Sequence, residues 1–235
     1  MPSARRSPSP HWSARRCGRA LRACWGVALF WGLLAAGQAW DADRMTQAAV
    51  RQGESAVQAL RALRQTLSSV AGQPELMQLG LINEFYNRRL LFRDDLDNWG
   101  QVDYWASPLE SLQRGQADCE DFAIAKYFTL AGMGVPHQRL RLVYVRATQG
   151  GPGGPVQAHM VLAYYPSPEA EPLVLDNLIT DVRPAGRRPD LSPVFSFNAE
   201  GIWEGVGGVS VAGQAADRLS RWRDVLQRAR QEGFF

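Results

Sequence analysis

Cysteine and histidine are scarce in this chain, whose 235 residues include three of each. Cys17 and Cys24 lie within the first 39 residues, and Cys119 is the only cysteine after them. If that first segment is removed, no intrachain disulfide can form. A lone thiol in an oxidising compartment is either buried and inert or retained for chemistry. The rest of the chain holds only two histidines, His137 and His159, so candidates for an imidazole base are few.

The chain also lacks a hydrophobic run long enough for a membrane anchor at its start. The apolar stretch from Ala23 to Ala36 is shorter than the roughly 20 residues that a membrane-spanning helix needs. Arginines precede it, and Gly37 and Ala39 stand at the −3 and −1 positions of a cleavage site. We therefore predict a cleavable signal peptide over residues 1–39, in preference to an uncleaved anchor, and a single domain over residues 40–235.

The excess of basic charge disappears with this segment. The whole chain has a formal charge of +3, from 26 basic and 23 acidic residues, but six of the basic residues are arginines before residue 40. The remainder has 20 basic and 23 acidic residues and therefore a charge of −3. This balance gives no electrostatic support for a nucleic-acid partner.

Apolar side chains at helical spacing predict helices on both sides of the central part of the chain. We expect one amphipathic helix over residues 43–70, a second over residues 75–92, and a final surface helix over residues 215–232 whose arginines form a solvated face. Ser107 and Glu110 have the spacing of a capping box, which predicts a short helix after Ser107.

A further helix is predicted to be central and buried. Asp118 is a favourable N-cap, residues 122–131 are almost wholly apolar, and glycines and Pro136 follow them. Three strand-like runs come next, at residues 140–147, 156–165 and 173–178. The order predicts an α+β fold in which the N-terminal helices and the central helix pack on an antiparallel sheet.

Cys119 falls in the first turn of this central helix. The free backbone N–H groups and the helix dipole at that position favour a thiolate, which suits a nucleophile. The alternative is that Cys119 is a small buried hydrophobe without chemistry.

His159 and Asp176 lie in two successive predicted strands. Asp176 stands among apolar neighbours, where a carboxylate needs a partner. A hairpin that pairs Tyr165 with Ala170 puts His159 directly opposite Asp176, so we predict that the two side chains meet. A buried structural histidine is the alternative for His159, and His137 is expected in an exposed loop. A thiol, an imidazole and a carboxylate are the three groups of a cysteine-dependent catalytic triad.

The same segments resemble the bacterial transglutaminase-like cysteine proteases of the LapG type. The resemblance extends from about Phe85 to Trp203, through FRDDLDNWGQVDYW, GQADCEDFAIAKYFTL, LRLVYV, QAHMVLAYY, LVLDNLI and VFSFNAEGIW. It implies a papain-like fold and a periplasmic endopeptidase with Cys119, His159 and Asp176 as its triad. It further implies a large surface adhesin as substrate, cut in its N-terminal region to promote biofilm dispersal, and an inner-membrane cyclic di-GMP receptor as inhibitor.

Calcium is also implied by the resemblance, with Asp118 and Glu120 matching the acidic positions beside the nucleophile. These carboxylates and Asp121 raise the pKa of a neighbouring thiol, and a bound divalent cation would remove that effect. Helix capping by Asp118 and Asp121 is the alternative that needs no metal.

Two other functions use the same residues. A transglutaminase would pass the acyl group to an amine rather than to water, and a non-catalytic calcium-binding module would keep the fold alone. Fast alkylation of Cys119 that depends on His159 would separate either enzyme from the module.

Overall fold

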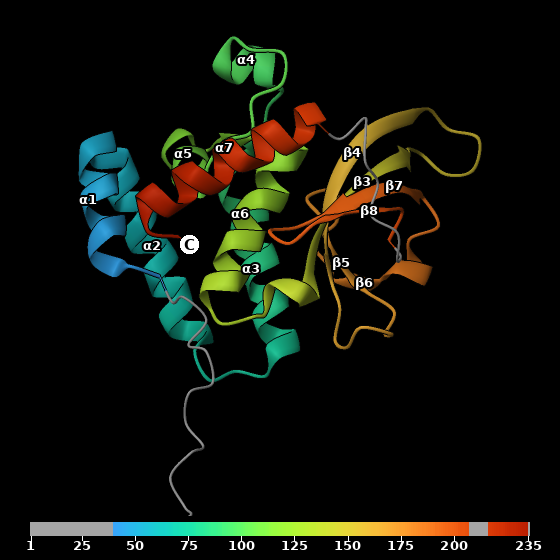
Figure 1. Ribbon diagram of the computed structural model, residues 1–235, viewed down its shortest axis with the longest axis horizontal. Helices are drawn as coiled ribbons and strands as arrows, with labels where there is room; N and C mark the ends of the chain where they lie inside the picture. The colour runs from blue at the N-terminus through green and yellow to red at the C-terminus, as the bar shows by residue number, and fades with distance from the viewer. Residues whose placement is uncertain (1–39, 207–215, 235) are drawn as a thin grey trace, which may run out of the picture. The chain divides into compact units, whose positions relative to one another are not determined.

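The structure is a computed structural model that describes residues 40–206 and 216–234 (Figure 1). The predicted signal peptide lies outside these residues. Within the described ranges, no helix has the length and apolar character to cross a membrane. The predicted α+β class is confirmed, because helices pack against one side of an antiparallel sheet.

The helical part begins with two helices where the sequence predicted one. Instead of a single helix over 43–70, α1 (Ala42–Gln52) and α2 (Glu54–Val70) meet at Gly53, whose φ of 104° interrupts the helical path. This conformation is strained for residues with a Cβ, so the glycine explains the break. The prediction of one continuous helix was therefore wrong.

The next helix is shorter than predicted. α3 (Glu75–Arg89) ends before Leu90, and the residues expected to complete it form strand β1 (Leu91–Phe92), which pairs in parallel with β2 (Gln116–Ala117). Two short helices follow, α4 (Asp95–Trp99) and α5 (Pro108–Arg114). The predicted capping box of α5 is confirmed by hydrogen bonds in both directions between Ser107 and Glu110.

The predicted central helix is α6 (Cys119–Gly132), which lies between the N-terminal helices and the sheet (Figure 1). It contacts β3 and β4 on one side and α3 and α5 on the other. Its residues from Asp121 to Leu130 are all buried, so the prediction of a central, buried helix is confirmed. The apolar run of α6 therefore lies between the helical layer and the sheet. The polar start of the helix lies at the border of the core.

The main sheet has six strands in the order β6-β5-β4-β3-β7-β8. Their bounds are β3 (Leu140–Thr148), β4 (Val156–Tyr164), β5 (Leu173–Leu175), β6 (Arg183–Pro184), β7 (Leu191–Phe197) and β8 (Ile202–Glu204). The three predicted strands are neighbours in this sheet, although β5 stops at Leu175 rather than at residue 178. Two single turns of 3-10 helix lie at His137–Arg139 and Ala185–Arg187.

The predicted register of β4 and β5 was wrong by two residues. The structure pairs Leu162 with Leu175, and Tyr164 with Leu173, so His159 and Asp176 are not directly opposite. Side chains alternate between faces with a period of two, and a shift of two residues therefore leaves both on the same face. The prediction that the two side chains meet survives this error.

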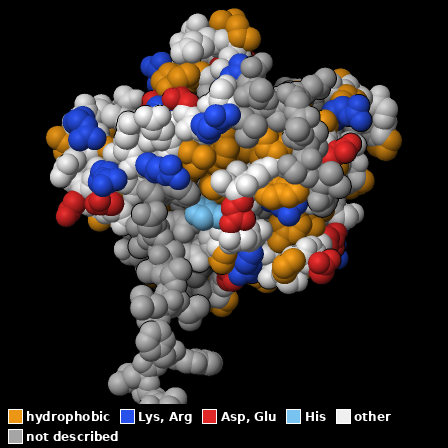
Figure 2. Space-filling view, viewed as in Figure 1, with side chains coloured by type: hydrophobic (Ala, Val, Ile, Leu, Met, Phe, Trp, Pro, Cys, Tyr) orange, Lys and Arg blue, Asp and Glu red, His pale blue; other side chains and the backbone are white. Residues whose placement is uncertain are grey.

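The C-terminal helix α7 (Ala216–Glu232) is present, but its arginines do not simply form a solvated face. Trp222 and Val225 are buried in the main core. Arg228 is partly buried, donates to the Trp105 carbonyl at 2.6 Å and forms an ion pair with Glu110. The helix is thus anchored by both apolar and charged contacts, and Figure 2 shows basic and acidic side chains together on this face of the molecule.

Candidate active site

Cys119 is the first residue of α6, as the sequence predicts. Asp118 is the N-cap, and its side chain accepts a hydrogen bond from the Asp121 amide at 3.4 Å. The partly buried Cys119 thiol donates to Glu120 Oε2 at 3.0 Å and accepts a hydrogen bond from the backbone amide of Met160. The thiol therefore lies between the start of the helix and strand β4.

The surroundings of this thiol oppose its ionisation. Burial is the largest effect and raises the pKa of Cys119 well above its ordinary value, and the charges of Glu120 and Asp118 raise it further. The Met160 amide acts in the opposite direction by donating to the sulfur. An imidazolium nearby, or a cation on the carboxylates, would favour ionisation of the thiol.

His159 and Asp176 form a buried hydrogen-bonded pair. The His159 Nε2 atom lies 2.8 Å from Asp176 Oδ1, and both side chains are almost fully buried. Burial raises the pKa of Asp176, but the bonds from His159, the Leu178 amide and Arg188 outweigh it and lower that pKa to about 2. The carboxylate is therefore ionised, so Nε2 carries the proton of this bond and Nδ1 is the ring nitrogen left to act as a base.

Arg188 also pairs with Asp176, and no pattern in the sequence predicted this contact. Its Nη2 atom lies 2.7 Å from Asp176 Oδ2 and 2.8 Å from Asp190 Oδ2, and its side chain is 4% exposed. The Arg188 guanidinium thus links Asp176 to Asp190 in the loop before β7. Arg188 lies in an ordinary polar loop sequence, and only the folded chain shows that it reaches Asp176.

A second chain of contacts holds the backbone of Asp176. Asn87 of α3 donates from Nδ2 to the Asp176 carbonyl at 2.7 Å, and its Oδ1 accepts from Lys126 Nζ at 2.7 Å. Lys126 is the only lysine of the chain and is fully buried in α6. Burial lowers the pKa of Lys126 to about 7, although the charge of Asp176 favours the protonated form. A charged residue inside the apolar run of α6 was the sequence feature that could have revealed this contact.

Three carboxylates gather beside Cys119, of which the sequence predicted two. Asp95 joins Asp118 and Glu120, and one oxygen of each lies within 4.8 Å of the others. The parallel pairing of Leu91 with Gln116 explains this arrangement, because it brings the start of α4 next to the start of α6. Asp95 lies within the FRDDLD run, but its proximity to Asp118 depends on this long-range pairing.

These acids repel one another strongly. Burial, together with the charges of Glu120, Asp121 and Asp95, raises the pKa of Asp118 to about 11. Burial and neighbouring acids likewise raise the pKa of Asp95 to about 6, and its buried Oδ1 has no hydrogen-bond partner among the described residues. An oxygen cluster with an unsatisfied buried acceptor fits a hard divalent cation such as calcium.

His137, the other candidate base, lies outside this site. It was expected in an exposed loop, but the structure shows it half-buried, with Nδ1 2.9 Å from the Tyr127 hydroxyl and the two rings stacked. The prediction of an exposed position was wrong, and the choice of His159 as the base stays a prediction.

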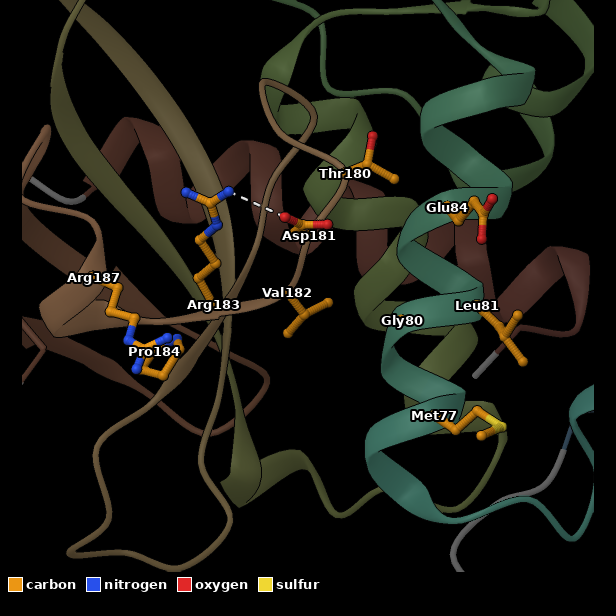
Figure 3. Close-up of a pocket in the computed structure, with 10 residues that line it drawn as sticks. All are labelled: Met77, Gly80, Leu81, Glu84, Thr180, Asp181, Val182, Arg183, Pro184 and Arg187. Atoms are coloured by element: carbon orange, nitrogen blue, oxygen red, sulfur yellow. Dashed lines mark hydrogen bonds and ion pairs between the residues drawn. The ribbon is translucent and has the colours of Figure 1, made fainter. Parts of the chain in front are cut away.

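A groove of about 770 Å³ lies between α3 and the segment that follows Asp176 (Figure 3). Its walls include Met77 and Glu84 of α3 and the exposed ion pair of Asp181 with Arg183. None of the three predicted site residues lines it. The groove is therefore separate from the candidate site at the start of α6.

The architecture is that of a transglutaminase-like cysteine protease, with a thiol at the start of a buried helix and a histidine and an acid on the adjoining antiparallel sheet. The chain belongs to the family of bacterial transglutaminase-like cysteine proteinases, whose model matches residues 52–189. A search of curated proteins found no match.

Solved structures of LapG from Legionella pneumophila are similar to this chain over most of its length. The calcium-bound form is 37% identical, with a TM-score of 0.67, and the match covers 79% of this chain and 97% of that protein. The EGTA-treated form is 38% identical, with a TM-score of 0.66 and coverages of 79% and 96%. These matches confirm the predicted fold and family.

Proposed function

We propose that this protein is a cysteine endopeptidase in which Cys119 is the nucleophile, His159 the general base and acid, and Asp176 the residue that orients the imidazole. The observation that supports it best is the buried bond between His159 Nε2 and ionised Asp176, which leaves Nδ1 free to serve a thiol. Membership of a cysteine protease family supports the same assignment.

The proposed reaction uses these three groups in turn. His159 Nδ1 takes the thiol proton, and Cys119 Sγ forms a bond to the peptide carbonyl carbon. The imidazolium then protonates the leaving amine as the C–N bond breaks, and an acyl-enzyme remains. Water, activated by the neutral imidazole, hydrolyses the thioester and restores the thiol. Asp176 and Arg188 keep their charges throughout, because Asp176 only holds the ring and stabilises its charged form.

We further propose that the enzyme depends on calcium bound by Asp95, Asp118 and Glu120. Bound calcium would supply positive charge that offsets the mutual repulsion of these acids and their effect on the thiol. The residues themselves fix the geometry: Asp118 caps α6, Asp95 accepts from the Tyr104 amide at 2.5 Å, and Glu120 accepts from the thiol. The calcium-bound and EGTA-treated forms of Legionella LapG support this part of the proposal.

The biological setting completes the proposal. A cleavable signal peptide directs the chain to the periplasm, where it cuts the N-terminal region of a large surface adhesin, which releases the adhesin and promotes biofilm dispersal. An inner-membrane cyclic di-GMP receptor holds it inactive. Membership of the family supports this proposal, and so does the start of the chain, where arginines precede an apolar stretch.

The test combines cleavage with labelling of the thiol. The processed protein is incubated with N-terminal regions of candidate adhesins, with calcium or with a chelator, beside the variant Cys119→Ala. We expect cleavage only by the wild-type protein with calcium, and rapid single-site alkylation by iodoacetamide that His159→Ala abolishes. Incorporation of an added amine at the cut site in place of water would favour transglutaminase chemistry, and an inert thiol would refute both enzymes.

A further inference from the structure

Strand β4 has an edge that is covered for only part of its length. On one side it pairs with β3 over its whole length, from Val156 to Tyr164. On the other side it pairs with β5 only from Leu162 to Tyr164. Among the described residues, no strand pairs with this second side between Val156 and Val161. This stretch without a paired strand is called the open edge below. It is exposed from residue 156 to 158 and becomes buried at His159 and Met160, where it reaches Cys119.

The direction of the backbone groups on β4 can be worked out from its two ends. The Pro155 carbonyl accepts from the Gln149 amide, and the Tyr165 amide donates to the Arg139 carbonyl, so both odd-numbered residues face β3. The pairing with β3 is continuous, and successive residues of a strand alternate in the direction of their N–H and C=O groups. Even-numbered residues of β4 therefore face away from β3.

Contacts at the site agree with this alternation. The amide of Met160 faces away from β3 and donates to Cys119 Sγ. Two residues earlier, Ala158 faces the same way, so its N–H and C=O point to the open edge roughly 7 Å from the Met160 position. Unpaired groups of this kind are ready to bind another extended chain.

The composition of the open edge supports a binding role. Natural edge strands are commonly protected by charged side chains, proline or a bulge. Residues 156–158 are Val-Gln-Ala, all three are exposed, and the pairing with β3 continues through them without a bulge. Val156 is 61% exposed, so an apolar side chain stands at the open edge. Within the described structure the edge thus lacks these protective features beside the nucleophile.

We propose that the substrate polypeptide binds as an added β-strand on the open edge, hydrogen-bonded to the N–H and C=O of Ala158, with its scissile carbonyl at Cys119 Sγ. This inference rests on the proposed protease function and extends it to the mode of substrate recognition. Because β5 occupies the edge from Leu162 onward, the added strand extends from Cys119 only toward Val156. The recognised substrate is an extended, accessible segment, and main-chain bonds supply much of its affinity.

The first experiment uses a peptide probe on the processed wild-type protein. Acetyl-tetra-alanyl chloromethyl ketone alkylates Cys119 as the thiolate carbon–sulfur bond forms and chloride leaves. Four analogues each carry one N-methyl group, at successive amides. We expect inactivation to slow by about tenfold at every second amide and little at the others, since alternate amides of an added strand face β4. Rates with glutathione correct for differences in intrinsic reactivity.

The second experiment changes the edge itself. Ala158→Pro removes an N–H that faces away from β3, a change that an edge strand can accommodate. We expect about a tenfold loss in the rate with the peptide ketone and an unchanged rate with iodoacetamide, which needs no strand pairing.

Glu204→Pro is the matched control at the opposite edge of the sheet. Gly205 donates to Val194 of β7, so the neighbouring Glu204 N–H faces away from β7. This variant should react with both reagents like the wild type.

The outcomes separate the two proposals. If Cys119 reacts with iodoacetamide but N-methylation shows no alternation, or Ala158→Pro reacts normally with the peptide ketone, the added-strand inference is overturned while the protease assignment stands. If Cys119 reacts with neither reagent, the protease assignment fails and the inference fails with it.

Discussion

Two buried carboxylate environments among the candidate site residues, Asp176 and the acidic cluster around Asp118, are balanced in opposite ways. Asp176 is held by His159, Arg188 and the Leu178 amide, and its pKa falls to about 2 in spite of burial. Asp118 lies among other acids, and burial and their charges raise its pKa to about 11. The Asp176 site is thus electrostatically complete within the described residues, whereas the acidic cluster is incomplete, and we propose that a cation from outside the chain completes it.

The largest expected effect comes from breaking the complete site. His159→Ala removes the base and should lower kcat/KM for an adhesin fragment by about 1000-fold, within the usual range for general acid–base catalysis. His137→Ala is the matched control. His137 is half-buried and hydrogen-bonded to the Tyr127 hydroxyl, but it has no part in the proposed mechanism. It should reduce kcat/KM by less than about threefold. Steady-state cleavage rates decide, and the reverse ranking would contradict the assignment of the base.

Breaking the incomplete site should have the next largest effect. Chelation, or the double change Asp118→Asn with Glu120→Gln, should lower cleavage by about 100-fold, since calcium bound at the first turn of α6 would fix the position of Cys119. Calcium should raise the Tm of the wild type, and the double variant should lose this shift. Magnesium should restore less activity than calcium.

Glu84→Gln is the control for this change, because Glu84 forms an exposed ion pair with Arg88 on α3. It should keep both the calcium shift in Tm and the activity. Full activity of the wild type in excess chelator would remove the calcium site from the proposal.

The sequence predicted the parts of this site that depend on local patterns. Asp118 as an N-cap before an apolar run placed Cys119 at the start of a helix, and strand alternation placed His159 and Asp176 on one face. The register was wrong by two residues because the predicted hairpin has four residues between Tyr165 and Ala170, whereas in the structure the last pair is Tyr164 with Leu173 and the loop is longer. The period of two preserved the face.

The rest of the site depends on contacts between distant segments. Asp95 reaches Asp118 through the parallel pairing of β1 with β2, which two-residue strands do not reveal in sequence. Arg188 and Asn87 reach Asp176 from a loop and from α3. No local pattern specifies these meetings, since each is fixed by the packing of the whole sheet against the helices.

A smaller effect is expected from removing the guanidinium that pairs with Asp176 in the complete site. Arg188→Met removes the positive charge that offsets the buried negative charge of Asp176. Asp190 loses its ion pair with Arg188 in the same change. We expect the free energy of unfolding to fall by about 3 kcal/mol. The control is Arg183→Met, because the Arg183 and Asp181 side chains are 45% and 73% exposed and such pairs contribute less than about 1 kcal/mol. Equal losses in urea unfolding would show that Arg188 does not compensate Asp176.

Glu232 of α7 represents a third solution, in which a buried carboxylate takes up a proton. It accepts from the Ser107 hydroxyl at 2.7 Å and from the Gln52 amide at 3.2 Å, and its Oε2 has no hydrogen-bond partner among the described residues. Burial is the main reason that its pKa rises from 4.5 to about 7. The folded protein therefore binds this proton more tightly than the unfolded chain does.

The smallest predicted effect follows from this difference and appears only as a dependence on pH. The stabilisation from protonated Glu232 is complete below pH 4.5 and is lost as the pH rises through about 7. Relative to Glu232→Gln, which cannot ionise, the wild type should lose up to about 3 kcal/mol of unfolding free energy across that interval. Both proteins are unfolded in urea with saturating calcium, so that titration of the acids beside Cys119 does not contribute to the difference between their stabilities. If the two stability curves run parallel from pH 4.5 to 7, Glu232 is ionised in the folded protein, and burial of a carboxylate without a close cation does not require a proton here.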